Sequence, residues 1–71
     1  MDYIPAGDLR PGDVFKRGWA RLQRFRVVEI GEHAIVGVVK IIGEDVETGD
    51  RRAFEFYRVN RVELGEDPND V

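Results

Sequence analysis

The sequence contains no cysteine and no serine, and it has a single threonine, a single histidine and a single tryptophan. Without cysteine, disulfides, thiolate metal sites and a cysteine nucleophile are excluded. The remaining hydroxyls are those of Thr48, Tyr3 and Tyr57, and His33 is the one imidazole. Because covalent and acid–base catalysis combines such groups, we expect a protein that is not an enzyme and binds no cofactor.

Long apolar runs are also missing. No stretch approaches the roughly 18 apolar residues that a membrane-spanning helix needs. Residues 1–6 include Asp2 and Pro5 and lack a basic region followed by an apolar one, so no signal peptide is expected. The sequence therefore predicts a cytoplasmic protein with no membrane partner. A chain of 71 residues forms one domain at most, too small to enclose a pocket for a small-molecule substrate.

Charge is unevenly distributed along the chain. Residues 10–26 hold six basic side chains against one acid, whereas residues 63–71 hold four acids and no base. The net charge of −3 thus conceals a dipolar surface, which differs from the uniformly basic surface of many nucleic-acid binders. We expect a folded domain over residues 1–64 and a frayed acidic tail over residues 65–71.

The pattern of apolar residues favours strands over helices. Pro11-Gly12 is typical of a type II turn, and Gly49 supplies the positive φ that a hairpin turn needs. A helix over residues 20–30 is the competing interpretation of that segment, but it lacks an N-cap residue. A β-bulge near Val27-Val28 would keep apolar side chains on one face. Strands are predicted over residues 14–17, 20–30, 34–42, 51–57 and 61–64, with a helical turn over residues 57–60.

Five short strands on such a small core favour an all-β barrel, because closure removes aggregation-prone edges. The predicted core comprises Leu9, Val14, Phe25, Val27, Ile30, Val36, Val38, Ile41, Phe54, Phe56, Val62 and Leu64.

The order of these predicted elements resembles a five-stranded SH3-like small β-barrel. The resemblance rests on the Pro11-Gly12-Asp13 turn, a loop that bears Trp19, two long central strands, a hairpin and a short last strand. The opening, Leu9-Arg10-Pro11-Gly12-Asp13-Val14, also resembles small proteins of actinobacteria and their phages. The chain lacks the acidic-aromatic loop and the Trp-Trp pair of peptide-binding SH3 domains, so polyproline recognition is not implied.

A basic-aromatic stretch over residues 15–26 is the first candidate binding region. Trp19 could stack on a nucleic-acid base or cap the open end of the barrel, and the cations could bind phosphates or form the solvated face of a strand. Arg17, Arg21 and Arg24 could also pair with the acidic tail. The candidate residues are Lys16, Arg17, Trp19, Arg21, Arg24 and Arg26.

The second candidate region is the strand predicted over residues 34–42, which is apolar on both faces. A half-solvated antiparallel strand alternates apolar and polar residues. Either Gly37 reorients the strand at a bulge, or a partner covers the face that carries Ile35, Val39 and Ile41. The leading interpretation is a non-catalytic protein-interaction module, of phage or bacterial accessory type, that binds a partner protein or itself. The alternative is a small nucleic-acid-binding barrel.

Two further features are interpreted as structural. The carboxylates around the predicted hairpin tip do not have the spacing of a calcium-binding loop, and no metal site is expected there. His33, next to Glu32 in a predicted turn, is expected to be solvated.

Overall fold

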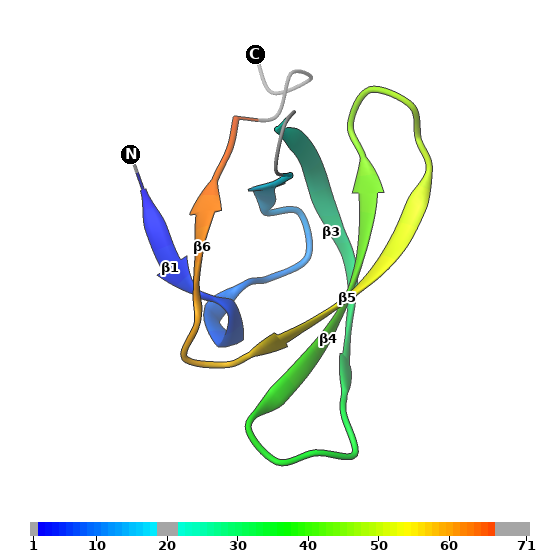
Figure 1. Ribbon diagram of the computed structural model, residues 1–71. Helices are drawn as coiled ribbons and strands as arrows, with labels where there is room; N and C mark the ends of the chain where they lie inside the picture. The colour runs from blue at the N-terminus through cyan, green and yellow to red at the C-terminus, as the bar shows by residue number, and fades with distance from the viewer. Residues whose placement is uncertain (1, 19–21, 67–71) are drawn as a thin grey trace.

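The computed structural model describes residues 2–18 and 22–66, and within them the chain is all-β, as the sequence predicts. The elements are the strands β1 (Tyr3–Pro5), β2 (Val14–Arg17), β3 (Gln23–Glu32), β4 (Val38–Asp45), β5 (Arg51–Tyr57) and β6 (Arg61–Leu64), with the 3-10 helix η1 (Ala6–Asp8) after β1 (Figure 1).

All six strands belong to one antiparallel sheet in the order β1-β6-β2-β3-β4-β5. The predicted five-stranded closed barrel is not what forms, because β1 is an additional strand and the sheet stays open. β6 pairs with β2 on one side and with β1 on the other. Among the described residues β5 pairs with β4 alone, so β1 and β5 are the two edges.

η1 joins the two ends of the sheet. The N–H of Ala6 donates to the carbonyl of Asn60 at 2.7 Å, and the N–H of Gly7 donates to that of Arg58 at 3.0 Å. These bonds attach η1 to the turn that connects β5 to β6, which lies beside η1 in Figure 1. The C-terminal end of β5 is therefore fixed against the N-terminal segment, although the two are not strand partners.

The β-bulge predicted near Val28 is present. The register between β3 and β4 shifts between Val27 and Glu29. Phe25 and Val27 are buried on the N-terminal side of the bulge, and Val28 is half-buried. The bulge does not bring Ile30 fully inside, since that side chain is 36% exposed. Beyond the bulge, β3 leaves the core and continues into the hairpin with β4.

Four phenylalanines form the centre of the core. Phe15 and Phe25 are fully buried, and the Phe15 ring meets those of Phe54 and Phe56 edge-on at 5.3 and 6.0 Å between centroids. Phe54 and Phe56 stack at 5.9 Å, as their predicted common face requires. Gly43 lies against this cluster, where an added Cβ would approach the Phe25 Cβ to 3.0 Å. Glycine at position 43 thus allows β4 to pass close to the aromatic rings.

Most of the predicted core is buried or half-buried, but Val36 and Ile30 are wrong assignments. Val36 is 98% exposed because it belongs to the turn over residues 33–37 and not to a strand. The prediction also missed buried residues, namely Ala6, Phe15 and Val39.

Several predicted boundaries need correction. β4 begins at Val38 and ends at Asp45, whereas the strand was expected over residues 34–42. The reason is that β3 extends to Glu32, where it pairs with Val39, which moves the turn toward Gly37 at φ +84°. Residues 58–60 form a turn without helical structure. At the other end, the N–H of Gly65 donates to the Val14 carbonyl at 2.8 Å, so contacts with the sheet continue past residue 64.

Candidate functional site

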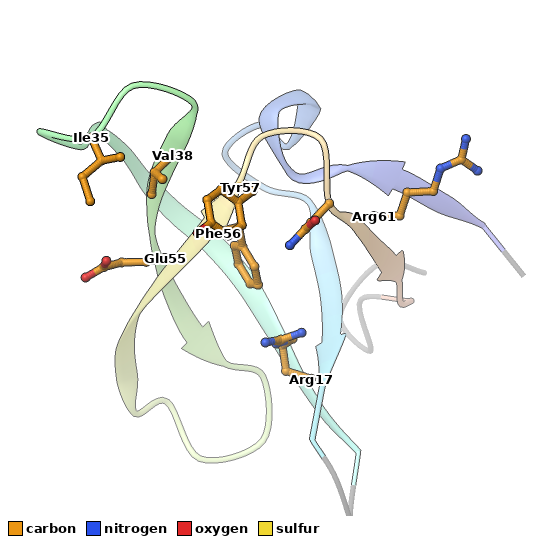
Figure 2. A pocket seen from close by; sticks show the side chains of 8 residues that line it. Arg17, Ile35, Val38, Glu55, Phe56, Tyr57 and Arg61 are labelled. Carbon is orange, nitrogen blue, oxygen red and sulfur yellow. The ribbon is translucent and has the colours of Figure 1, made fainter.

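A hollow of about 540 Å³ opens between the turn over residues 33–37, the C-terminal end of β5 and the end of β2 (Figure 2). Its apolar lining comes from Val38 and Phe56, which are buried, and from Ile35 and Tyr57, which are exposed. Its polar lining comes from Arg17, Glu55, Asn60 and Arg61. Three separate parts of the chain therefore meet at one concave surface.

Strand register brings these residues together. Val38 is the first residue of β4 and pairs with Tyr57, while Val39 pairs with Phe56. Beyond this pair, the N–H of Arg58 donates to the carbonyl of Gly37 at 2.8 Å. The turn after β3 is thus attached to the turn after β5, and the hollow lies where the two turns meet.

His33 holds the turn in place. Its Nδ1 accepts the N–H of Ile35 at 3.0 Å, and its Nε2 lies 2.9 Å from Oε2 of Glu55. A neutral imidazole with its proton on Nε2 satisfies both contacts. The His33 side chain is only 19% exposed, so the expectation of a solvated histidine is wrong. This link places Ile35 beside β5.

Exposed apolar side chains continue from the hollow across the two neighbouring turns. Ile35 and Tyr57 are 60% and 62% exposed. Val36, the residue after Ile35, is 98% exposed, and Val59, two residues after Tyr57, is 82% exposed. Single exposed apolar residues are common, whereas a group gathered at one end of a small domain is typical of an interaction surface. We call Ile35, Val36, Tyr57 and Val59 the apolar rim.

Two arginines at the hollow have no carboxylate partner among the described residues. The Arg17 guanidinium lies over the Phe56 ring, 4.9 Å from its centroid. Arg61, at the start of β6, pairs with Pro5 of β1 along the backbone and makes no ion pair with any described carboxylate. The acid of the hollow, Glu55, already faces His33. Among the described residues, Arg17 therefore brings a positive charge without a carboxylate partner to the apolar floor of the hollow, while the guanidinium of Arg61 points away from the other lining side chains in Figure 2.

The other described cations of the basic-aromatic stretch pair with acids on neighbouring strands. Lys16 contacts Glu63 at 3.1 Å, and Arg26 lies 3.8 Å from Glu44. Arg24 lies 3.8 Å from Glu47, and its guanidinium also donates to the carbonyl of Glu66 at 3.1 Å. Trp19 and Arg21 lie outside the described residues. Of the described members of this stretch, Arg17 is the one that reaches the hollow.

The predicted apolar partner surface requires a correction. Val39 and Ile41 are 2% and 0% exposed and belong to the core, so they cannot contact a partner in the folded monomer. They point inward because the register of β4 with β5 sets Val39 opposite Phe56 and Ile41 opposite Phe54, and directly opposite residues share one face of the sheet. Ile35 lies in the turn before β4 and is exposed, and it contributes to the hollow from there.

The carboxylates near the hairpin of β4 and β5 serve the fold. Oδ1 of Asp45, a buried residue, accepts hydrogen bonds from the N–H groups of Glu47 at 2.8 Å and Thr48 at 3.2 Å, and its Oδ2 accepts one from Nε2 of Gln23 at 3.3 Å. Glu44 lies within 4 Å of both Arg26 and Arg51. Within residues 2–18 and 22–66, no group of three or more His, Asp or Glu side chains is arranged to hold a metal ion.

Six residues of the hollow were not among the predicted binding residues, although two of them, Val38 and Phe56, were predicted for the core; the six are Val38, Glu55, Phe56, Tyr57, Asn60 and Arg61. Tyr57 gave a usable signal, because it follows Ala53 and Glu55 on the outer face of the predicted strand. An exposed aromatic residue at the end of a strand is a reasonable candidate for binding. Asn60 and Arg61 carry no such signal, since their place depends on how the turn after β5 meets η1.

Comparison with known proteins finds no family model that matches the chain, and no curated protein or solved structure that matches it significantly. In the part of the chain that the structure describes, no helix is long and apolar enough to cross a membrane.

Proposed function

We propose that the chain is a non-catalytic protein-interaction module whose hollow binds a short segment of a partner protein. The segment would place an apolar side chain against Val38, Phe56 and Tyr57 and a carboxylate beside Arg17. The SH3-like resemblance remains part of this proposal, and it is supported by the position of β6 beside β2 and by the single turn between β5 and β6. The cytoplasmic location and the likeness to actinobacterial and phage proteins remain predictions.

The observation that carries the proposal is the unpaired charge of Arg17 at an apolar hollow. Lys16, Arg24 and Arg26 each have an acid within 4 Å, whereas Arg17 contacts an aromatic ring and no described carboxylate. Guanidinium groups bind carboxylates in a planar, bidentate geometry. The charge therefore favours an acidic ligand, and the apolar rim favours one with an aromatic or aliphatic anchor.

Binding suits this surface better than catalysis. Its ionisable groups are two guanidiniums, one carboxylate and one phenol. An arginine stays protonated and cannot act as a base, and Glu55 is engaged with His33. The alternative of nucleic-acid binding through residues 15–26 has less support, because three of its cations already neutralise acids of the same chain.

The experiment that tests the proposal selects ligands from a displayed library of random short peptides. We expect the selected peptides to combine acidic residues with an aromatic or aliphatic residue. Arg17→Glu and Tyr57→Ala should each weaken their binding by about tenfold or more, equivalent to about 1.4 kcal/mol.

Matched controls are Arg10→Glu and Tyr3→Ala, which alter an exposed arginine and an exposed tyrosine outside the hollow. Both should bind the selected peptides as the parent does. Selection of basic peptides, or equal losses in the controls and the hollow variants, would refute the proposal.

A further inference from the structure

β5 carries hydrogen-bonding groups along an open edge. The N–H of Asp45 donates to the carbonyl of Asp50, and the N–H of Arg58 donates to that of Gly37, which makes 45/50 and 37/58 hydrogen-bonded pairs in one register. Such pairs alternate with non-bonded pairs along an antiparallel ladder. The backbone groups of Arg52, Phe54 and Phe56 therefore face β4. Those of Arg51, Ala53 and Glu55 face away from it, and no partner strand covers them among the described residues.

The two edges of the sheet differ in how they resist pairing with another chain. β1 has three residues and ends in Pro5, and short strands and prolines are common ways of protecting an edge. β5 has seven residues, is in regular register with β4 and contains no proline, lysine or glycine. Contacts with η1 reach only its C-terminal end, through the turn after Tyr57. The first five residues of β5 thus combine open backbone groups with the charged side chains of Arg51, Arg52 and Glu55, so pairing with a further strand requires that those charges be matched.

The charges on the exposed face of β5 match those of a second, antiparallel copy of β5. Arg51, Ala53 and Glu55 alternate along the exposed face of β5 as positive, small and negative. A second β5 in antiparallel orientation, with its Ala53 opposite Ala53, sets Arg51 against Glu55 of the second copy and Glu55 against Arg51. Ala53, Arg51 and Glu55 all have outward-facing backbone groups, so this register also forms hydrogen-bonded pairs.

We propose that two copies of this chain associate through β5 in this register, forming a symmetric dimer whose sheet continues from one copy into the other. Opposite charges directly across an antiparallel pair stabilise it, and like charges destabilise it. Because the pairing is isologous, each change in the sequence acts twice. Within one copy, Arg51 lies 3.9 Å from Glu44, and Glu55 contacts His33. The Arg51 and Glu55 side chains are themselves exposed.

The dimer is independent of the peptide-binding function proposed for the hollow, although Glu55 borders both surfaces. Tyr57→Ala should weaken peptide binding by about tenfold or more and leave association unchanged. Ala53→Pro should prevent association and leave peptide binding unchanged, because the N–H that proline lacks faces the open edge and not β4. The two proposals can therefore fail separately, because each variant affects one measurement and not the other.

Sedimentation equilibrium of the full chain over a concentration series tests the dimer. We expect reversible dimerisation of the parent. Arg51→Glu and Glu55→Arg should each weaken the dimer by about tenfold, and the double variant, which restores opposite charges, should recover it to within about threefold. Arg10→Glu is the control and should dimerise as the parent does. A parent that stays monomeric at about 1 mM, or a dimer that tolerates both single reversals, overturns the proposal.

Amide hydrogen exchange locates the contact directly. The N–H groups of Ala53 and Glu55 should exchange slowly at high protein concentration and rapidly at low concentration. That of Phe54, which faces β4, should be protected at both, and it serves as the internal control. Concentration-independent exchange at Ala53 and Glu55 in a dimeric sample would contradict pairing through β5.

Discussion

The guanidinium of Arg17 lies 4.9 Å from the centre of the Phe56 ring, while Phe56 is itself only 5% exposed. A cation from the end of β2 thus covers the edge of the aromatic core, and its charge is left for the hollow. Lys16, one residue earlier, points to the other face of β2 and pairs with Glu63. The alternation of a strand therefore separates a cation available for binding from one used in the fold.

The aromatic core should dominate stability. Phe25→Ala removes a ring that is 1% exposed and that contacts Phe15 and Phe54, with centroids at 5.9 and 4.9 Å. The expected loss is about 3–5 kcal/mol, enough to unfold much of a domain this small. Chemical denaturation followed by circular dichroism measures it. Tyr57→Ala, at an exposed ring, is the comparison and should change stability by less than about 1 kcal/mol.

The close approach at Gly43 predicts a second stability effect. An added methyl would lie 3.0 Å from the Phe25 Cβ and 3.1 Å from the Phe54 ring. Gly43→Ala should therefore destabilise the domain by about 1–3 kcal/mol. Gly31→Ala is the matched variant, because nothing lies within 4 Å of its added methyl. Equal effects of Gly43→Ala and Gly31→Ala on the melting temperature would contradict close packing of β4 against the phenylalanines.

Asp45 should behave as a structural residue of the β4–β5 hairpin. Asp45→Ala leaves the N–H groups of Glu47 and Thr48 without their acceptor, which should cost about 1–3 kcal/mol. Asp50 is exposed, and it uses only its own backbone N–H and carbonyl to bond Thr48 and Asp45. Asp50→Ala should therefore cost less than about 1 kcal/mol. Urea titrations of the two variants give the comparison. Equal stability of both would show that the carboxylate does not support the turn.

The paired cations predict weak binding to nucleic acid. At physiological salt the parent should bind labelled duplex and single-stranded oligonucleotides no more tightly than about 100 μM, the weak end of non-specific affinities. Fluorescence anisotropy over a salt series measures this. Tighter binding that falls steeply with salt, and that is lost in Arg24→Glu, would favour the alternative function over the proposed one.

Local features of the fold were predictable from the sequence, and features set by distant partners were not. The turns at Pro11-Gly12 and at Gly49 are determined by a few adjacent residues, so the sequence alone predicts them. Both glycines have positive φ, at 96° and 80°. The start of β4 was misplaced because it depends on how far β3 pairs past its bulge. Which face of β4 is buried depends on its register with β5, where Val39 lies opposite Phe56, and a segment that is apolar on both faces does not show that register.

The candidate site was predicted only in part for the same reason. Arg17 and Ile35 could be named from local charge and hydrophobicity. The pairing of Lys16 with Glu63 joins residues 47 apart in sequence, and no local pattern shows which cations remain unpaired. The hollow itself arises from a hydrogen bond between Arg58 and Gly37, two residues that no motif connects.

The most direct test of the central claim is an NMR titration of the labelled protein with a peptide selected as described above. We expect amide shift changes to concentrate at Arg17, Ile35, Tyr57 and Asn60. In Arg17→Glu they should need about ten times more peptide or more, whereas Arg10→Glu should preserve them. Amide shift changes confined to Arg24, Arg26 and their neighbours on β3, with Arg17 and Tyr57 unaffected, would contradict peptide binding in the hollow.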